Sequence, residues 1–314
     1  MHKNVKLRCF AKKNIEKMIL KLNAPLKNYV WGGTKLKTNY GKQCQTNVAE
    51  SWELSFVPQS ESVVASGVNK GKILPEVVTS ADLGKNCQKF DIFPTLIKFI
   101  NAEQNLSVQV HPSDSYAKTH ENALGKTEMW YVLDAEPNAK LYLGLNKSVT
   151  KEQFCAAVEQ NRVIELLNAV PVAAGETYFV PSGTLHAIGA GITLLEIQQN
   201  STLTYRVYDY GRLVDGKPRE LHLQKALDVA NLEKYNVPNP QRESFLGGCK
   251  YFSAYRHSGA HTFCNADSFS SVTVVEGSVN LNGLALVKGE TAFVSAGEKA
   301  EISGNGSYVI TCVE

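Results

Sequence analysis

An internal repeat constrains the fold of this chain more than any other feature of its sequence. The segment GETYFVPSG at residues 175–183 returns as GETAFVSAG at residues 289–297, with Gly, Glu, Thr, Phe, Val and the final Gly in the same places. Each copy consists of a glycine turn, a short strand-forming run and a second turn. The repeat therefore predicts two similar units, each built like a small jelly-roll barrel.

The rest of the sequence is also typical of β-structure. Helical periodicity is clear only at 94–103, 150–168 and 220–231. The predicted fold is therefore mainly β, with a few peripheral helices. Short apolar or alternating runs between glycine, asparagine and proline predict strands at 50–56, 62–68, 105–111, 128–133, 139–145, 176–181, 192–199 and 203–209.

Changes in composition divide the chain into three parts. Residues 1–17 are strongly basic and lack the apolar core of a secretory signal, so we expect a disordered basic leader there. The run NVPNPQR at 236–242 places two prolines in a polar context, which is typical of a linker. We therefore expect one unit at residues 18–235 and a second at 236–314.

Charge, apolar content and cysteine usage exclude several classes of protein. The basic leader accounts for the net charge of +3, which leaves the remainder slightly acidic and without the basic face of a nucleic-acid-binding protein. No apolar run reaches the length of a membrane span. Seven scattered cysteines with no Cys-x-x-Cys pair argue against a disulfide framework. We expect a cytoplasmic protein with neither nucleic acid nor membrane as a partner.

Two polar residues on one strand are candidates for a metal site. Gln109 and His111 lie two apart in NLSVQVHP, so their side chains share one face of the strand, while Val108 and Val110 share the other. Burying this polar pair is costly unless something binds it. A metal ion is one such partner, and a hydrogen-bonded core histidine is the alternative.

Glu128 and His186 complete a plausible set of metal ligands. Two imidazoles, one carboxylate and one amide oxygen suit zinc, with room for water or substrate, although iron and manganese also accept such ligands. Taken singly, Glu128 could be a strand-edge carboxylate and His186 a turn histidine. In the second copy of the repeat Ala300 stands where the first has His186. We therefore expect one zinc ion per chain, in residues 18–235, and a metal-free second unit.

Four long motifs resemble a known family. They are FPTLIKFINAEQNLSVQVHPSD, GKTEMWYVLD, GETYFVPSGTLHAIGAGITLLEIQQNS and TYRVYDYGR, and together they are similar to the type I mannose-6-phosphate isomerases in their short bacterial form. The resemblance implies a double cupin fold and a zinc-dependent aldose–ketose isomerase. It implies that mannose 6-phosphate and fructose 6-phosphate interconvert through a cis-enediolate, so the partner is a small sugar phosphate and no obligate protein partner is implied.

The resemblance also assigns roles to individual residues. It places the metal ligands on Gln109, His111, Glu128 and His186, and the substrate-facing side chains on Lys98, Ser107, Lys126, Glu196 and Arg206. Arg206 would stabilise the negative charge that develops on oxygen, and Lys98 and Ser107 would bind substrate. Glu196 is our first choice for the proton-transferring group and Lys126 is its competitor. The sequence departs from the family at Thr202, where an aspartate is usual.

Two other functions remain open on the sequence alone. An iron-dependent cupin dioxygenase would use similar ligands, but it would not need the basic set Lys98, Lys126 and Arg206. A sugar-phosphate sensor that binds a metal without turnover would keep both the ligands and the basic residues.

Overall fold

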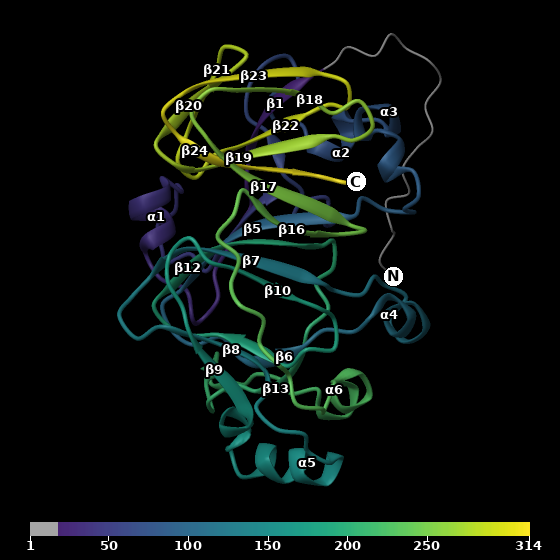
Figure 1. The fold of residues 1–314 in the computed structure, drawn as a ribbon, viewed down its shortest axis with the longest axis vertical. Helices are drawn as coiled ribbons and strands as arrows, with labels where there is room; N and C mark the ends of the chain where they lie inside the picture. Colours follow the sequence, from purple (N-terminus) through teal and green to yellow (C-terminus); the bar gives the residue numbers. More distant parts are fainter. Residues whose placement is uncertain (1–17) are drawn as a thin grey trace.

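Four stacked β-sheets form the core of residues 18–314, the part of the chain that this computed structural model describes (Figure 1). The basic leader predicted at residues 1–17 lies outside the described residues. Strands β5 and β6 are consecutive in the chain but lie in two neighbouring sheets, and the same is true of β11 and β12. The chain therefore passes repeatedly between sheets, as in a jelly roll.

The first unit contains a five-stranded and a six-stranded antiparallel sheet. In sheet order, the five strands are β13 (Tyr205–Tyr208), β6 (Val108–Val110), β11 (His186–Ile188), β8 (Lys140–Leu145) and β9 (Leu167–Pro171). The six strands are β10 (Thr177–Val180), β7 (Glu128–Ala135), β12 (Ile192–Gln199), β5 (Thr95–Ala102), β3 (Glu50–Leu54) and β2 (Leu26–Lys27).

The second unit contains a seven-stranded and a four-stranded sheet. The seven strands are β16 (Phe245–Cys249), β17 (Phe252–Ser258), β24 (Ser307–Cys312), β19 (Ser270–Glu276), β22 (Thr291–Val294), β1 (Ile19–Asn23) and β4 (Val63–Val64). The four strands are β18 (His261–Cys264), β23 (Lys299–Gly304), β20 (Ser278–Leu281) and β21 (Leu284–Val287).

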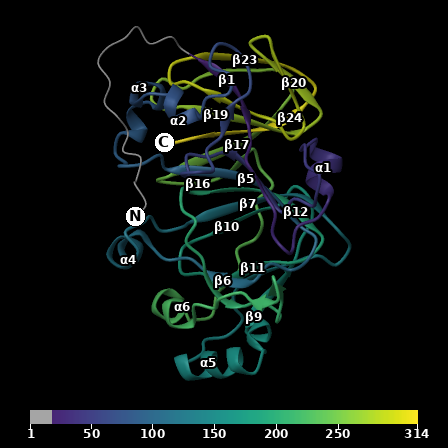
Figure 2. The same cartoon turned by 180° about the vertical axis from the view of Figure 1, so that it is seen from behind.

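The helices lie around this stack, and α5 and α6 cover the outer face of the five-stranded sheet (Figures 1 and 2). A small hairpin joins β14 (Leu213–Val214) to β15 (Lys217–Pro218). The helices are α1 (Lys35–Tyr40), α2 (Leu74–Val77), α3 (Ser80–Leu83), α4 (Asp114–His120), α5 (Lys151–Glu159) and α6 (Leu223–Val229), with 3-10 turns η1 (Lys85–Cys87) and η2 (Val163–Leu166).

Alternating side chains fill the layers between the sheets. On β12, Leu194 packs into the first unit, whereas Leu195 and Ile197 pack with Phe252 and Phe293 of the second unit. The six-stranded sheet is therefore covered on both faces. The prediction of a mainly β, double cupin fold with few helices is confirmed.

This double burial explains a wrong prediction at 94–103. Those residues form β5, not a helix, and all eight residues of the strand are buried. A strand packed on both faces has apolar residues at consecutive positions, so its periodicity cannot be told from that of a buried helix segment. The other two helices are present but shorter: α5, capped by Thr150 and Gln153, ends at Glu159, and α6 spans Leu223–Val229.

The internal repeat is a repeat of structure. Gly175 and Gly289 both have φ of 89°, a left-handed conformation that favours glycine. Strands β10 and β22 follow them at matching positions. After the second turn, β11 begins with His186, whereas Ala300 of β23 is fully buried in the apolar core of the second unit. The second copy thus has a packed methyl group where the first has an imidazole.

The N-terminal strand crosses the boundary expected between the units. Strand β1 pairs with β22 on one side and with β4 on the other. We keep the division into 18–235 and 236–314 as a proposal for the chain as a whole. By hydrogen bonding, however, β1 and β4 belong to the seven-stranded sheet of the second unit.

Two further features concern membrane spans and cysteines. Within residues 18–314 no helix is long and apolar enough to cross a membrane. The cysteines in this part of the chain are Cys44, Cys87, Cys155, Cys249, Cys264 and Cys312, and all of them are free thiols.

The apolar layer between the six- and seven-stranded sheets should dominate stability. Phe293 is fully buried in this layer and stacks on Phe269 with ring centroids 5.7 Å apart. We expect Phe293→Ala to destabilise the protein by about 3–5 kcal/mol because it leaves a cavity between two rigid sheets. Val287→Ala, at a position that is 52% exposed, should change stability by less than about 0.5 kcal/mol. Urea unfolding midpoints check this, and equal shifts for the two variants would contradict it.

Candidate metal centre and active site

One row of site residues runs across the six-stranded sheet. Antiparallel register aligns Trp52 of β3 with Lys98 of β5, Lys98 with Glu196 of β12, and Glu196 with Trp130 of β7. Side chains aligned in this way project from the same face. Glu128 lies two residues before Trp130 on β7 and so shares that face. This face looks into the first unit.

A second row runs across the five-stranded sheet. Gln109 of β6 is aligned with His186 of β11 on one side and with Arg206 of β13 on the other. Val108 and Val110 are fully buried with residues of α5 and α6 on the opposite face. The predicted alternation on this strand is therefore correct. The two rows bring residues far apart in sequence into one site between the two sheets.

Three buried side chains form a group that could hold a metal ion. Nε2 of His111 lies 3.5 Å from Oε2 of Glu128, and Nε2 of His186 lies 3.2 Å from Oε1. Nδ1 of His111 contacts the Leu203 carbonyl at 2.8 Å, and Nδ1 of His186 contacts the Thr184 carbonyl at 2.9 Å. A carbonyl only accepts hydrogen bonds, so each Nδ1 donates and each Nε2 carries a lone pair. The lone pair of His111 Nε2 has Lys126 Nζ 3.1 Å away as well as Glu128.

Burial sets the charge of these three groups. It lowers the pKa of His186 to about 4, and burial together with the Lys126 charge holds the pKa of His111 well below its usual range. Both imidazoles are therefore neutral at neutral pH, as metal ligands must be. Burial raises the pKa of Glu128 to about 7 despite the opposing charge of Lys126.

A chain of ion pairs continues from Glu128. Lys126 Nζ lies 2.6 Å from Glu128 Oε2 and 3.9 Å from Glu196 Oε1, and Lys98 Nζ lies 3.0 Å from Glu196 Oε2 and 3.5 Å from Glu50 Oε2. Burial alone would raise the pKa of Glu196, but the charges of Lys126 and Lys98 lower it to about 2. Glu196 is therefore ionised, and Lys98 is a buried ammonium group that lies in a strand.

Gln109 lies beside His186 at the edge of the group. Its Nε2 is 3.3 Å from Nε2 of His186, and its Oε1 is 3.5 Å from the hydroxyl of Ser107. A half-turn of the amide would point Oε1 at the imidazoles and let Nε2 donate to the Ser107 oxygen. Gln109 can therefore offer an amide oxygen while both of its polar atoms keep partners.

Arg206 makes its side-chain hydrogen bond outside the metal group. Its Nη1 donates to the Glu220 carbonyl at 2.8 Å, and its buried Nε makes no hydrogen bond within residues 18–314. Tyr205 and Val207 are buried on the opposite face of β13. Thr202, the position that departs from the expected pattern, is exposed.

The charges and orphaned atoms of the site fit a bound cation. Three buried carboxylates, those of Glu50, Glu128 and Glu196, face two buried ammonium groups, those of Lys98 and Lys126. Oε1 of Glu128 is buried and accepts no hydrogen bond from any residue between 18 and 314, whereas Oε2 is ion-paired with Lys126 Nζ but accepts no well-directed hydrogen bond. A cation among Glu128, His111 and His186 would offset the surplus negative charge.

Two residues of the site were missed by the sequence analysis. Glu50 is buried, accepts a 2.6 Å hydrogen bond from Trp52 Nε1 and pairs with Lys98. Trp130 donates from Nε1 to Glu196 at 3.2 Å, and its ring meets that of His186 edge-on with centroids 5.3 Å apart. The alternation in ESWEL could have placed Glu50 and Trp52 on one face, but it does not reveal that this face lines the site.

Comparison with known proteins decides the family. Residues 19–146 match the family model described as phosphomannose isomerase type I, catalytic domain. The chain is 40% identical to mannose-6-phosphate isomerase ManA of Bacillus subtilis, over 80% of this chain and 83% of that protein. It belongs to the type I phosphomannose isomerases. A mannose-6-phosphate isomerase of Streptococcus mutans is 36% identical over 86% of this chain and 90% of that protein.

Solved structures agree with this assignment to the phosphomannose isomerases. The crystal structure of the mannose 6-phosphate isomerase from Bacillus subtilis matches with a TM-score of 0.85 and 33% identity, covering 93% of this chain and 99% of that one. A structure titled as a putative mannosephosphate isomerase from Archaeoglobus fulgidus has a TM-score of 0.79 at 22% identity, which supports the fold alone. The resemblance found from the four motifs is confirmed.

The metal group should bind one ion per chain. Elemental analysis should find about one metal ion per chain, and the double variant His111→Ala, His186→Ala should lose it because two of the nitrogen ligands are gone. The matched control is His257→Ala, His261→Ala, which removes a stacked pair of imidazoles, 4.2 Å apart, from the second unit. Two ions per chain, or equal metal content in both double variants, would contradict the assignment.

Proposed function

We propose that this phosphomannose isomerase interconverts mannose 6-phosphate and fructose 6-phosphate with one zinc ion held by Gln109, His111, Glu128 and His186. One observation carries the proposal: a buried His–Glu–His group lies beside a chain of buried lysine–glutamate pairs, in a protein that shares 40% identity with a curated mannose-6-phosphate isomerase. The ligands are nitrogen and oxygen without thiolate, a set that zinc accepts.

The reaction moves a proton between C1 and C2 of the open-chain sugar through a cis-enediolate. A base must take a proton from one carbon and return it to the other, while positive groups stabilise the charge that develops on the sugar oxygens. When bound, zinc would supply a Lewis acid for these oxygens. The remaining requirements fall on side chains of this protein.

Glu196 is our proposed proton-transferring group. Its carboxylate is buried and ionised, so it has lone pairs to accept a proton, and Lys98 and Trp130 fix its orientation from two sides. These contacts hold the carboxylate in one position. A group that moves a proton between two neighbouring carbons needs such a fixed position. Lys126, 3.9 Å from Glu196 and 2.6 Å from Glu128, is the alternative.

Arg206 is proposed to stabilise the enediolate, and Lys98 and Ser107 are proposed to bind the substrate. A guanidinium is permanently charged and cannot serve as a ligand of zinc, so its use here is electrostatic. The buried, unpaired Nε of Arg206 is a donor available for an oxyanion. Lys98 and Ser107 are both buried at the site, where their polar groups can reach sugar oxygens.

A coupled assay tests the proposed function. Incubation of the zinc-loaded protein with mannose 6-phosphate should produce fructose 6-phosphate at a rate proportional to protein concentration. A protein that binds the sugar phosphate without turnover would be a sensor and would disprove the proposal. Iron in place of zinc, with oxygen uptake, would favour a cupin dioxygenase.

Substitution of Arg206 separates transition-state stabilisation from substrate binding. We expect Arg206→Ala to keep its zinc and to lower kcat by about 10²- to 10³-fold, the effect of removing one preorganised oxyanion donor. A higher KM with an unchanged kcat would instead indicate equal binding of substrate and transition state. Arg162→Ala, which removes an exposed arginine that directly precedes η2 and pairs with Glu165, is the control and should leave both constants unchanged.

A further inference from the structure

The segment between His111 and Glu128 carries Lys126 and includes α4. Two hydrogen bonds, donated by backbone N–H groups at its far end, bring that end back beside the residues that follow His111. Lys126 N donates to the Pro112 carbonyl at 3.0 Å, and Gly125 N donates to Asp114 Oδ1 at 3.0 Å. A Cβ on Gly125 would come within 2.5 Å of Asp114 N, so the two ends of the segment are in tight contact. The position of the Lys126 backbone therefore depends on Pro112 and Asp114.

Asp114 is the residue where this segment meets the rest of the protein. Its Oδ1 also accepts a hydrogen bond from Gln199 of β12. Its Oδ2 accepts from the hydroxyl of Tyr251, and Lys250 Nζ lies 3.3 Å away. Both Tyr251 and Lys250 belong to the turn between β16 and β17 in the second unit. One carboxylate thus joins the Lys126 segment, the six-stranded sheet and the second unit.

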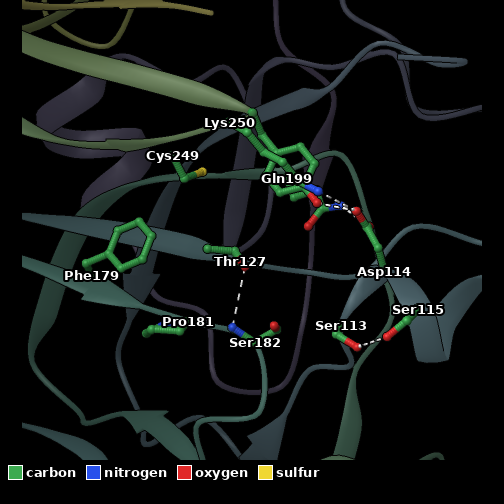
Figure 3. Close-up of a pocket in the computed structure, with 11 residues that line it drawn as sticks. Ser113, Asp114, Ser115, Thr127, Phe179, Pro181, Ser182, Gln199, Cys249 and Lys250 are labelled. Atoms are coloured by element: carbon green, nitrogen blue, oxygen red, sulfur yellow. Dashed lines mark hydrogen bonds and ion pairs between the residues drawn. The ribbon is translucent and has the colours of Figure 1, made fainter. Parts of the chain in front are cut away.

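These contacts lie beside a cleft of about 460 Å³ between the two units. Figure 3 shows the side chains of Gln199 and Lys250 directed at Asp114, with Thr127 and Ser182 joined by a hydrogen bond on the opposite side. Gln199 follows Gln198 on β12, and Thr127 directly precedes Glu128, the first residue of β7, so both side chains project away from the metal group. The cleft is therefore separated from the site by the edge of the sheet.

The carboxylate of Asp114 is not needed to cap α4. The hydroxyl of Ser113 is the side chain that accepts from Tyr116 N at the start of that helix. Burial alone would raise the pKa of Asp114, but the hydrogen bonds from Tyr251 and Gln199 lower it, so the group is ionised at neutral pH. Ionised acceptors make strong hydrogen bonds. The hydrogen bonds to the Asp114 carboxylate therefore position the segment between His111 and Glu128.

We propose that Asp114 is a positioning residue through which Tyr251 of the second unit holds Lys126 in place at the metal site. This inference rests on the proposed function, because its effect is measured on turnover. It gives the metal-free second unit a part in catalysis: the turn between β16 and β17 holds the carboxylate, and the carboxylate holds the backbone next to Lys126. Displacing a working group by a fraction of an ångström is enough to slow an enzyme.

A pair of tyrosine variants tests the proposal. Tyr251→Phe removes only the hydroxyl, since the contact between the Phe90 and Tyr251 rings and the bond from Thr95 to the Tyr251 carbonyl remain. We expect kcat to fall about 3- to 10-fold, as for loss of one well-placed hydrogen bond, with KM and zinc content close to the parent's. The matched control, Tyr131→Phe, removes another tyrosine hydroxyl between the units, which Arg256 contacts at 3.3 Å, and should leave kcat unchanged.

Variants of Asp114 supply a second, independent test. Asp114→Ala should lower kcat about 10- to 100-fold, whereas Asp114→Asn should recover most of the loss because its amide oxygen can still accept from Gly125. Equal kcat for the Tyr251 and Tyr131 variants would overturn the proposal. Zinc loss parallel to the loss of kcat would also overturn it, because the effect would then act on His111. A parent protein without turnover would disprove the proposed function, whereas an active parent with unaffected variants would disprove only this inference.

Discussion

The cost of removing charge from water is the constraint on which the rest of this structure depends. Lys98, Lys126, Glu128 and Glu196 are all nearly inaccessible to solvent between two sheets. Each would be strongly unfavourable alone, and each is tolerated because an opposite charge lies close by. The imidazoles meet the same constraint by remaining neutral. A site of this kind can form only where two facing sheets place side chains of opposite charge next to one another.

Strand register is what supplies that complementarity. Lys98 lies opposite Glu196 because β5 and β12 pair without a shift over eight residues, and Gln109 lies opposite both His186 and Arg206 because β6 is between their strands. A slip of one residue in either ladder would turn these side chains to the other face, into apolar layers. The apolar residues on the opposite faces, such as Ile97, therefore fix the register and so keep the site residues on the face that lines the site.

Much of this arrangement could be predicted from sequence, and the exceptions have physical reasons. The repeat, strands such as β7 and β12, and the common face of Gln109 and His111 follow from local patterns of turns and alternation. The helix wrongly predicted at 94–103 follows from the burial of β5 on both faces, which erases the alternation. Glu50 and the contact between Asp114 and Tyr251 depend on distant segments meeting, and no local pattern carries that information.

The pairing of β1 with β22 has a consequence for the order in which the protein can be completed. Residues 19–22 leave the ribosome well before residues 291–294, their partners in β22. Until β22 has been synthesised, β1 is without that side of its ladder, and the seven-stranded sheet cannot close around it. Contacts between such distant residues carry a large entropic cost and form late. Vectorial synthesis can therefore give a partly assembled first unit early, but closing the seven-stranded sheet joins two segments that are far apart in the sequence.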